Sequence, residues 1–204
     1  MARFAGALLL CLGLLVTVSH TVRGSDPDLT TDFGITAISA ANFTFTGFRN
    51  IQPGGKGVAG PTPASFQQLP GLTGLGLTAV QFEFGPQSQI NPHIHPRGTE
   101  IFYVLSGVID VGFVDTNNDL FETTLQKGDL FVFPKGCLHF QRNNCDGPAS
   151  GFSALSSENP GTLLVASALF TAGGKGLPDK VLTTALGTNT KTVDSIKKAL
   201  GDVL

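Results

Sequence analysis

The strongest constraint on the fold is a succession of short β-forming runs between residues 75 and 140, with no helical period between them. The runs are LGLTAVQFEF, EIFYVLSG, VIDVGFVD, LFETTLQ, LFVFP and LHFQRN. They stop at residues typical of turns: Gly85-Pro86, Gly107, TNND, Lys127-Gly128-Asp129 and Pro134-Lys135-Gly136. Strands that follow one another in this way predict an all-β sandwich or barrel.

The regions on either side of these runs carry different signals. Residues 53–63 are rich in glycine and proline, and we expect a mobile loop there. Residues 161–170, GTLLVASALF, complete the set of predicted strands. The chain then changes to helical spacing.

Two C-terminal segments predict α-helices. PDKVLTTALG ends at Gly187 and places four residues on one face: Val181, Leu182, Ala185 and Leu186. TVDSIKKALGDVL aligns three more: Val193, Ile196 and Leu200. Because an apolar helix face needs a partner surface, we expect these helices to serve oligomerisation.

The N-terminus has the features of a secretory signal peptide. Arg3 precedes an apolar run over residues 5–18, and small residues follow near Gly24. This run of 14 residues is shorter than the roughly 20 that a spanning helix needs, which makes an uncleaved anchor the weaker alternative. We therefore expect residues 1–24 to be removed and residues 25–204 to form a single secreted domain without a membrane span.

The charge of the mature chain argues against a nucleic-acid partner. The whole chain has 13 Lys plus Arg and 15 Asp plus Glu, so removal of Arg3 and Arg23 leaves 11 against 15, a net charge of −4. No basic stripe is present that would neutralise phosphates.

Secretion also bears on the cysteines and on glycosylation. Cys137 and Cys145 remain after cleavage, and along a strand they would lie ~26 Å apart, beyond the roughly 7 Å that a disulfide spans. We expect two free thiols unless the chain folds back after Asn143. The sequon Asn42-Phe43-Thr44 makes Asn42 a candidate for N-glycosylation.

The three histidines beyond the expected leader form one candidate site. His93 and His95 are two residues apart, so in a strand they point to the same face. Glu100 follows the turn residues Pro96-Arg97-Gly98, and His139 opens a later strand. Three imidazoles and one carboxylate form an open site for a first-row transition metal. The alternatives are ordinary core histidines or a histidine pair on a surface strand.

Two motifs around these residues resemble those of the germin-like proteins in the cupin superfamily. The first is HIHPRGTEIFYVLSG, with His93, His95, Glu100 and Gly107 in place, although seven residues separate Gly85 from His93 where the motif has five. The second is GDLFVFPKGCLHFQRN, with Gly128, Pro134, His139 and Asn143 in place. Further segments also resemble germins: SDPDLTTDFG, FSALSSENPG and PDKVLTTAL.

The resemblance implies a cupin jelly-roll β-barrel with an N-terminal arm and C-terminal α-helices. It implies one manganese ion per subunit, bound by His93, His95, Glu100 and His139, through which any catalysis would act. Manganese itself comes from the family, because such ligands alone would bind copper or zinc more tightly. The resemblance also implies an extracellular glycoprotein of the plant cell wall (the apoplast), in contact with the wall matrix, that assembles as a hexamer, a trimer of dimers.

Two departures from the family pattern are informative. Gly34 stands where most germins have a cysteine, so the N-terminal arm lacks its disulfide. Val80 and Ile90 stand where oxalate-oxidising germins resemble one another in having asparagines, and Asn91 is displaced by one residue. Apolar side chains cannot hydrogen-bond a buried dianion, so we expect little or no oxalate oxidase activity.

Two classes of function remain open from the sequence. One is superoxide dismutation, often reported for germin-like proteins, in which Asn143 or Gln141 orients a metal-bound water; a structural hydrogen bond is the alternative role for both. The other is a non-catalytic metal-binding wall protein with a storage (nutrient reservoir) or receptor-like role. Arg97 lies in the turn between the ligands, where it guides an anion or is simply solvated.

Overall fold

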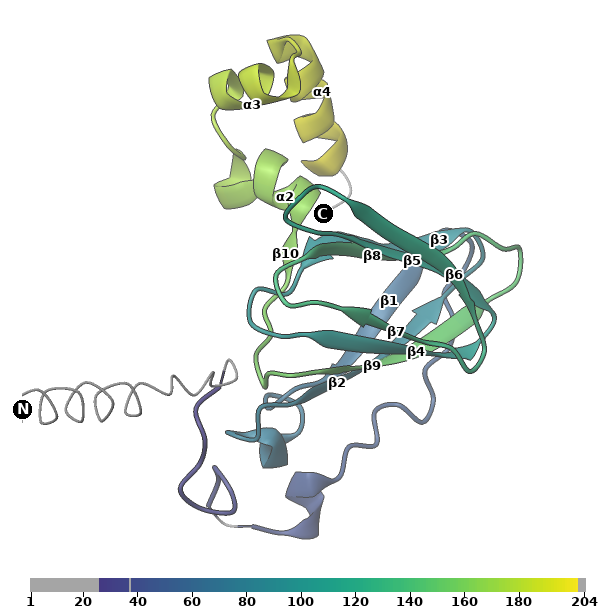
Figure 1. Cartoon of the computed structure of the whole chain (residues 1–204), viewed down its shortest axis with the longest axis vertical. Helices are drawn as coiled ribbons and strands as arrows, with labels where there is room; N and C mark the ends of the chain where they lie inside the picture. Colours follow the sequence, from purple (N-terminus) through teal and green to yellow (C-terminus); the bar gives the residue numbers. More distant parts are fainter. Residues whose placement is uncertain (1–25, 37, 202–204) are drawn as a thin grey trace, which may run out of the picture.

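Two five-stranded antiparallel sheets face each other and form a jelly-roll barrel, as the sequence predicted (Figure 1). The computed structural model describes residues 26–36 and 38–201, so the expected leader at residues 1–24 lies outside the described residues. One sheet has the order β1-β2-β9-β4-β7 and the other the order β10-β3-β8-β5-β6. The strands are β1 Ala59–Ala64, β2 Thr78–Phe84, β3 Ser88–Ile94, β4 Glu100–Ser106, β5 Val108–Val114, β6 Leu120–Gln126, β7 Leu130–Phe133, β8 Leu138–Asn143, β9 Ala149–Leu155 and β10 Leu163–Leu164.

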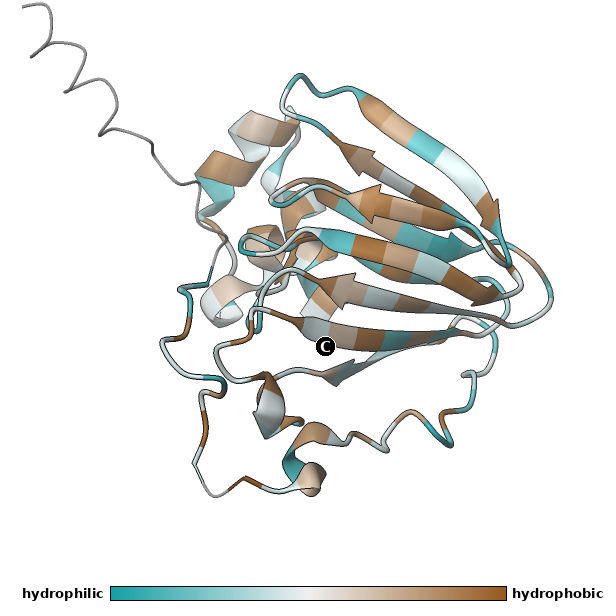
Figure 2. Cartoon of the chain, turned by 60° about the horizontal axis from the view of Figure 1, so that its bottom comes forward, coloured by the Kyte–Doolittle hydropathy of each residue, from teal (hydrophilic) through white to brown (hydrophobic). Residues whose placement is uncertain are grey.

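The barrel core forms because hydrophobic side chains alternate along the strands (Figure 2). In β2 and β9 every second residue is buried. The inward side chains pack into one cluster: Val80, Phe82, Phe84, Phe102, Val104, Ile109, Val111, Leu125, Phe133, Ala149 and Leu155. This cluster fills the interior of the barrel and surrounds the polar residues of the site.

The prediction of a mobile loop at residues 53–63 is partly wrong. Ala59–Ala64 form the strand β1, which pairs with β2 so that Pro61 lies opposite Phe82 and Pro63 opposite Val80. Proline cannot donate a backbone hydrogen bond, but β1 is the edge of its sheet, where one side needs no partner.

The prediction of a strand over residues 161–170 is also wrong for most of its length. Only Leu163–Leu164 form a strand, β10, which pairs with His93 and Ile94 of β3. The chain then turns into helix α2, Val165–Phe170. The period of a short apolar run cannot distinguish a strand from a buried helix. Here the helix is favoured because Phe170 packs against the other helices.

Three helices form a compact unit beside the barrel, which we call the helical unit (Figure 1). It comprises α2, α3 Asp179–Leu186 and α4 Thr190–Gly201; α3 ends as predicted, at Gly187 with a φ of 59°. Its core contains Phe170, Leu182 and Val193, packed with Leu169, Ile196 and Leu200. Lys197 Nζ lies 2.6 Å from Asp179 Oδ1 and ties α4 to α3.

This packing corrects our reason for assigning the helices to oligomerisation. The partner surface of Val193, Ile196 and Leu200 lies within the same chain. Of the four residues expected on one face of α3, Leu182 is buried, whereas Val181 and Leu186 are 51% and 49% exposed.

The N-terminal arm runs along the end of the barrel opposite the helical unit (Figure 1). It contains the 3-10 helix η1, Ala40–Phe43; two further 3-10 helices, η2 and η3, span Pro70–Leu72 and Ala172–Gly174. Asp26 replaces the missing disulfide as an anchor, because its two carboxylate oxygens accept hydrogen bonds from Ser157 Oγ (3.0 Å) and Glu158 N (2.7 Å). Both cysteines in the described part of the chain, Cys137 and Cys145, are unpaired, as expected.

Candidate metal centre

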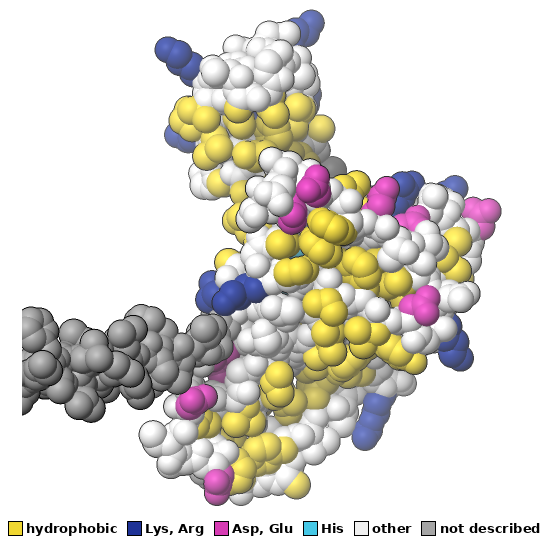
Figure 3. Space-filling view, viewed as in Figure 1, with side chains coloured by type: hydrophobic (Ala, Val, Ile, Leu, Met, Phe, Trp, Pro, Cys, Tyr) yellow, Lys and Arg dark blue, Asp and Glu magenta, His cyan; other side chains and the backbone are white. Residues whose placement is uncertain are grey.

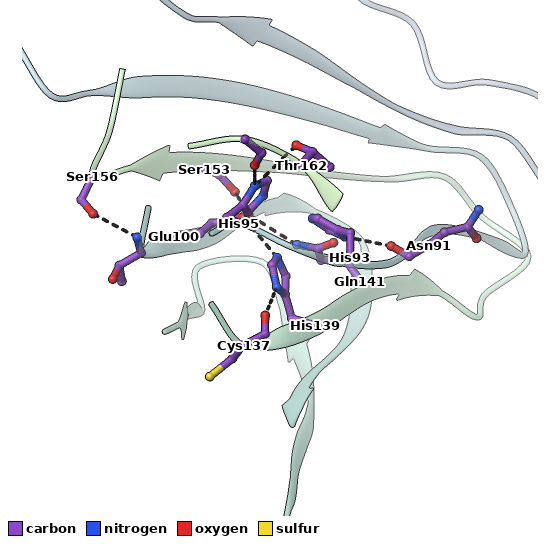
Figure 4. Close-up of polar contacts among 12 residues, drawn as sticks. Asn91, His93, His95, Glu100, Cys137, His139, Gln141, Ser153, Ser156 and Thr162 are labelled. Atoms are coloured by element: carbon purple, nitrogen blue, oxygen red, sulfur yellow. Dashed lines mark hydrogen bonds and ion pairs between the residues drawn. The ribbon is translucent and has the colours of Figure 1, made fainter. Parts of the chain in front are cut away.

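Four buried side chains converge inside the barrel (Figure 4). His93 is the last buried residue of β3, and His95 directly follows that strand. Glu100 begins β4, and His139 lies in β8. Their exposed fractions range from 1% to 8%, and one nitrogen or oxygen atom of each lies within 4.8 Å of the others. The structure thus brings together all four expected ligands, which we call the histidine–glutamate cluster.

Strand pairing explains the convergence. His93 lies opposite His139 in the β3–β8 pair, so two imidazoles share one inward position. Bends at residues 96–97 carry the chain across to the other sheet, where Glu100 pairs with Phe133 and Leu155. The turn predicted between the ligands is therefore confirmed.

A β-bulge in β3 sets the direction of His93. The register shifts between Ile90 and His93, so residues three apart both face the interior. Pro92 lies in this bulge, where its missing N–H interrupts no hydrogen bond between the strands. Asn91 is exposed and its side-chain oxygen accepts a hydrogen bond of 2.8 Å from Gln89 Nε2. The bulge thus leaves the Asn91 side chain bonded to that of Gln89, and both residues line the cavity that adjoins the cluster.

Backbone carbonyls fix the orientation of all three imidazole rings. Nδ1 of His93, His95 and His139 lies 2.8, 2.5 and 2.9 Å from the carbonyl oxygens of Asn91, Gly161 and Cys137. Each Nδ1 therefore donates, which leaves each Nε2 with a lone pair. Metal-binding histidines are held in this way in proteins.

The two oxygens of Glu100 have different surroundings. Oε1 accepts hydrogen bonds from Ser153 Oγ (2.6 Å) and Gln141 Nε2 (3.4 Å). Oε2 lies 3.1 Å from His95 Nε2 and 3.5 Å from His139 Nε2. In the described part of the chain, Glu100 Oε2 and His139 Nε2 are buried without a hydrogen-bond donor or acceptor. Buried polar atoms of this kind call for a partner, and a cation between them provides one.

The pKa values of His93 and Glu100 suit a cation, whereas that of His95 favours a proton that a metal would displace. Burial, followed by the nearby His139, lowers the pKa of His93 to about 4. Burial opposes ionisation of Glu100, but the contacts with His139, His95 and Ser153 outweigh it and lower its pKa to about 2. Burial likewise opposes protonation of His95, but Glu100 and the Gly161 carbonyl outweigh it and raise its pKa. Near neutral pH, His93 is neutral and Glu100 ionised, the states that bind a metal.

The placement of Asn143 does not support a role in orienting water at the cluster. Its carboxamide is fully used by the backbone: Nδ2 donates to the carbonyl oxygens of Gly85 (2.9 Å) and Gly147 (2.8 Å), and Oδ1 accepts from Cys145 N (3.0 Å). It also pairs with Ser88, at the opposite end of the β3–β8 ladder from His139. This placement favours a structural role.

Gln141 and Arg97 lie closer to the cluster. Gln141 is fully buried, and its Oε1 lacks a hydrogen-bond partner among the described residues. Arg97 is exposed but engaged, since Nε and Nη2 donate to the backbone oxygen (2.7 Å) and side-chain oxygen (3.0 Å) of Asn159. Arg97 thus holds the loop whose Gly161 carbonyl orients His95.

A cavity of about 660 Å³ adjoins the cluster, and we call it the site cavity. Its lining includes His93 and His95, as well as Val80 and Ile90, the two apolar residues at the expected substrate positions. The sequence reasoning missed Ser153 and Gly161. The signal for Ser153 was a polar residue at an inward position of a strand; Gly161 gave none, because it acts through its backbone.

Comparisons with known proteins agree with this fold. The family model described as "Cupin" matches residues 50–194. Germin-like protein 5-1 of Oryza sativa subsp. japonica is 47% identical over 139 residues, which cover 68% of this chain and 62% of that protein. Germin-like protein subfamily 2 member 1 of Arabidopsis thaliana is 37% identical over 217 residues, which cover 95% and 96% of the two chains.

Solved structures give the same fold. An oxalate oxidase in complex with the substrate analogue glycolate superposes with a TM-score of 0.73 at 28% identity, covering 85% of this chain and 97% of that chain. The fold, the histidine–glutamate cluster and both sequence comparisons lead to one assignment. This chain is a germin-like protein of the cupin family.

Proposed function

We propose that this protein is a secreted plant cell-wall protein that binds one manganese ion per subunit and dismutates superoxide. The observation that carries the proposal is the histidine–glutamate cluster, whose four donor atoms lie within 4.8 Å of one another. Residues 1–24 would be removed, and residues 25–204 would form the single cupin domain of the mature protein.

The residues present fit a metal ion of this kind. The orphaned Glu100 Oε2 and His139 Nε2 atoms provide donors that no protein group satisfies in the described structure. Manganese bound there would supply one-electron cycling between its divalent and trivalent states. Imidazole and carboxylate ligands are compatible with manganese, and the choice over copper or zinc rests on the family.

The chain's own residues would do the rest. His93 and His95 border the site cavity, which admits small molecules to the cluster. Gln141 Oε1, buried and unpaired among the described residues, can accept a hydrogen bond from a water there and so orient that water at the site. The ionised Glu100 keeps the cluster from accumulating positive charge. Because superoxide is so small, its dismutation needs few further contacts between the protein and the substrate.

Oxalate oxidation is not part of the proposal. Val80 and Ile90 line the site cavity, and neither can donate a hydrogen bond to a dicarboxylate. We expect little or no hydrogen peroxide release from oxalate by the manganese-loaded protein.

The proposed setting is the apoplast, with the protein assembled as a hexamer, a trimer of dimers, against the wall matrix. An apolar surface on the outer side of β4 and β7, which we call the outer β4–β7 face, supports assembly; it comprises Ile101, Tyr103, Leu105, Leu130 and Val132, exposed by 38% to 54%. Figure 3 shows hydrophobic side chains gathered on one face of the barrel and on the helical unit. Within the described residues, no helix is long and apolar enough to cross a membrane.

Asn42 is the proposed glycosylation site. It lies in η1, and its Oδ1 accepts hydrogen bonds from Ser39 N (2.9 Å) and Ser39 Oγ (3.1 Å). These contacts use the oxygen and not the side-chain nitrogen to which a glycan would be joined, which is consistent with modification at this position.

The second candidate is a non-catalytic metal-binding wall protein with a storage or receptor-like role. It is favoured by the absence of hydrogen-bonding groups at Val80 and Ile90. Superoxide removal in the presence of cyanide and peroxide separates the two, measured before and after the metal is stripped and restored. Activity that tracks manganese content supports dismutation. A stable, manganese-loaded but inert protein supports the non-catalytic role.

A further inference from the structure

The site cavity is larger than superoxide requires. It lies between β1, β2, β3 and the loop that follows β9, and its volume of about 660 Å³ falls among those of pockets that enclose drug-sized molecules, roughly 300–1,000 Å³. His93 and His95 form part of its wall, so a molecule within it would lie against the histidine–glutamate cluster. This size points to a second, larger ligand at the same site.

The charge of the lining disfavours a strongly anionic ligand. Within residues 26–36 and 38–201, no lysine or arginine lines the cavity. Apart from the two histidines its ionisable side chain is Glu158, whose carboxylate accepts the backbone N–H of Gly74. The neighbouring cation Arg97 is bonded to Asn159 and turned to the loop. Neutral polar residues such as Asn91 and Thr162 also line the cavity and can hydrogen-bond an anion, but no protein cation there offsets the cost of its desolvation.

The walls favour a flat apolar body. Pro61 and Pro63 of β1 line the cavity beside their pairing partners Phe82 and Val80 of β2, so these four residues form one wall on the same sheet. Ile90 adds an apolar surface from β3, directed inward by the bulge. Proline rings and buried side chains lose little freedom when a ligand packs on them, so such walls bind a rigid ring at small entropic cost.

The end of the cavity at the cluster favours oxygen donors. His93, His95, Glu100 and His139 would hold the metal through four donor atoms, and an open site of this kind can accept oxygen atoms from a ligand. Two adjacent hydroxyl groups on a ring supply two oxygens on one edge and leave the opposite edge apolar. Such a molecule is uncharged near neutral pH, which suits a lining without cationic side chains.

We propose that the site cavity binds a neutral aromatic molecule with two adjacent hydroxyl groups. Its ring packs between Val80, Ile90 and the prolines of β1, and its oxygens face the histidine–glutamate cluster. This inference rests on the metal site of the proposed function and adds to it the class of ligand that the cavity accepts.

The test uses 2,3-dihydroxynaphthalene as a fluorescent probe, titrated into the full manganese-loaded protein. The chain has no tryptophan and one tyrosine, so its own fluorescence interferes little. We expect saturable binding that weakens at least about tenfold, or 1.4 kcal/mol, when the metal is removed. 2,3-Dimethoxynaphthalene should bind weakly and equally to both forms, and oxalate should not displace the dihydroxy probe at equal concentration.

Substitutions in the lining of the site cavity test where the aromatic ring of the probe lies. Val80→Asn and Ile90→Asn should each weaken probe binding about tenfold while leaving the manganese content unchanged. Val108→Asn, a matched change at an exposed position of β5, should leave probe binding unchanged. Equal probe affinity in all four proteins, or displacement by oxalate, overturns the inference.

Metal analysis keeps the two proposals apart. If manganese is stoichiometric but the probe does not bind, the ligand assignment is wrong and the metal site stands. If no metal is held after loading, both fail.

Discussion

Ser153 Oγ lies 2.6 Å from Glu100 Oε1, and this hydrogen bond joins strand β9 to the first residue of β4. Because Oε1 is occupied in this way, Oε2 is the oxygen that faces His95 and His139, at 3.1 and 3.5 Å. A buried serine thus decides which carboxylate oxygen is available to a metal. Partners of metal ligands commonly contribute to metal affinity in this manner.

The Ser153→Ala variant should lose metal affinity while keeping the fold. Without the hydroxyl, Glu100 can rotate and no longer presents Oε2 in a fixed direction. We expect the manganese affinity to fall about 10- to 100-fold, measured by competition with a chelator.

Ser150→Ala is the matched control on the same strand. Ser150 lies on the outward side of β9 and its hydroxyl is bonded to that of Ser106 at 2.7 Å. Its affinity should equal that of the unaltered protein. Equal affinities in the Ser150 and Ser153 variants would contradict the role given to Ser153.

Arg97 should matter for metal binding although it is exposed and touches no ligand. It bonds Asn159 through its side chain, and its backbone N–H donates to the Pro160 carbonyl at 3.1 Å. This loop supplies the Gly161 carbonyl that holds His95 Nδ1. Arg97→Ala should therefore weaken manganese binding about tenfold in the chelator competition.

The control for this change is Arg142→Ala, which also removes an exposed guanidinium. Arg142 lies in β8, and its Nη2 donates to Asn144 Oδ1 at 3.0 Å. This bond lies away from the loop at residues 159–161, so its loss should leave the affinity unchanged. A drop of the same size in both variants would mean that general charge, and not loop anchoring, is responsible.

Local patterns in the sequence were enough to find the ligands. His93 and His95 share strand parity, and the turn at residues 96–98 allows Glu100 to face them despite its opposite parity. The strands β2 and β4 to β8 were equally readable, because turn residues separate these runs of β-forming residues. These features depend on neighbours along the chain, and they were confirmed.

What the sequence did not reveal depends on distant contacts. Gly161 reaches His95 across 66 residues and through a carbonyl oxygen that every residue has. Helix α2 forms where an apolar run had predicted a strand, because Phe170 packs against α3 and α4. The apolar face of α4 was correctly identified, whereas in α3 only Leu182 of the four expected residues is buried, and only tertiary packing shows that the two helices cover one another.

The outer β4–β7 face should be a subunit interface. Ile101 lies beside Val132, and Tyr103 beside Leu130, in the β4–β7 pair, and all four are exposed. Val132→Lys would place a charge within this apolar surface. We expect the assembly to dissociate, seen as a smaller mass in light scattering, with the manganese content unchanged.

A lysine elsewhere on the barrel serves as the control. Thr123 is exposed on β6 of the other sheet, so Thr123→Lys should leave the mass unaltered. If Val132→Lys retains the full oligomeric mass, this face is not the interface.

The burial of His93 predicts that the metal-free protein loses stability below about pH 6.5. Burial and His139 hold the pKa of His93 at about 4, against 6.5 for the free side chain. Between these values the unfolded chain binds more protons, so the free energy of unfolding falls as the pH falls, by up to about 3 kcal/mol. Glu100, with a pKa of about 2 against 4.5, extends the loss to lower pH. His95 acts in another window, because its raised pKa gives stability that is lost above pH 6.5.

Urea unfolding of the chelator-treated protein at several pH values measures this dependence. His93→Gln removes the titrating ring, so the decline between about pH 6.5 and pH 4 should become shallower, while the decline due to Glu100 at lower pH persists. His95→Gln should flatten the curve above pH 6.5, and it should also reduce the decline due to Glu100, because the contact with His95 helps to lower the pKa of Glu100. If His93→Gln follows the same acid curve as the unaltered protein, the protonation of His93 does not limit the stability of the metal-free barrel.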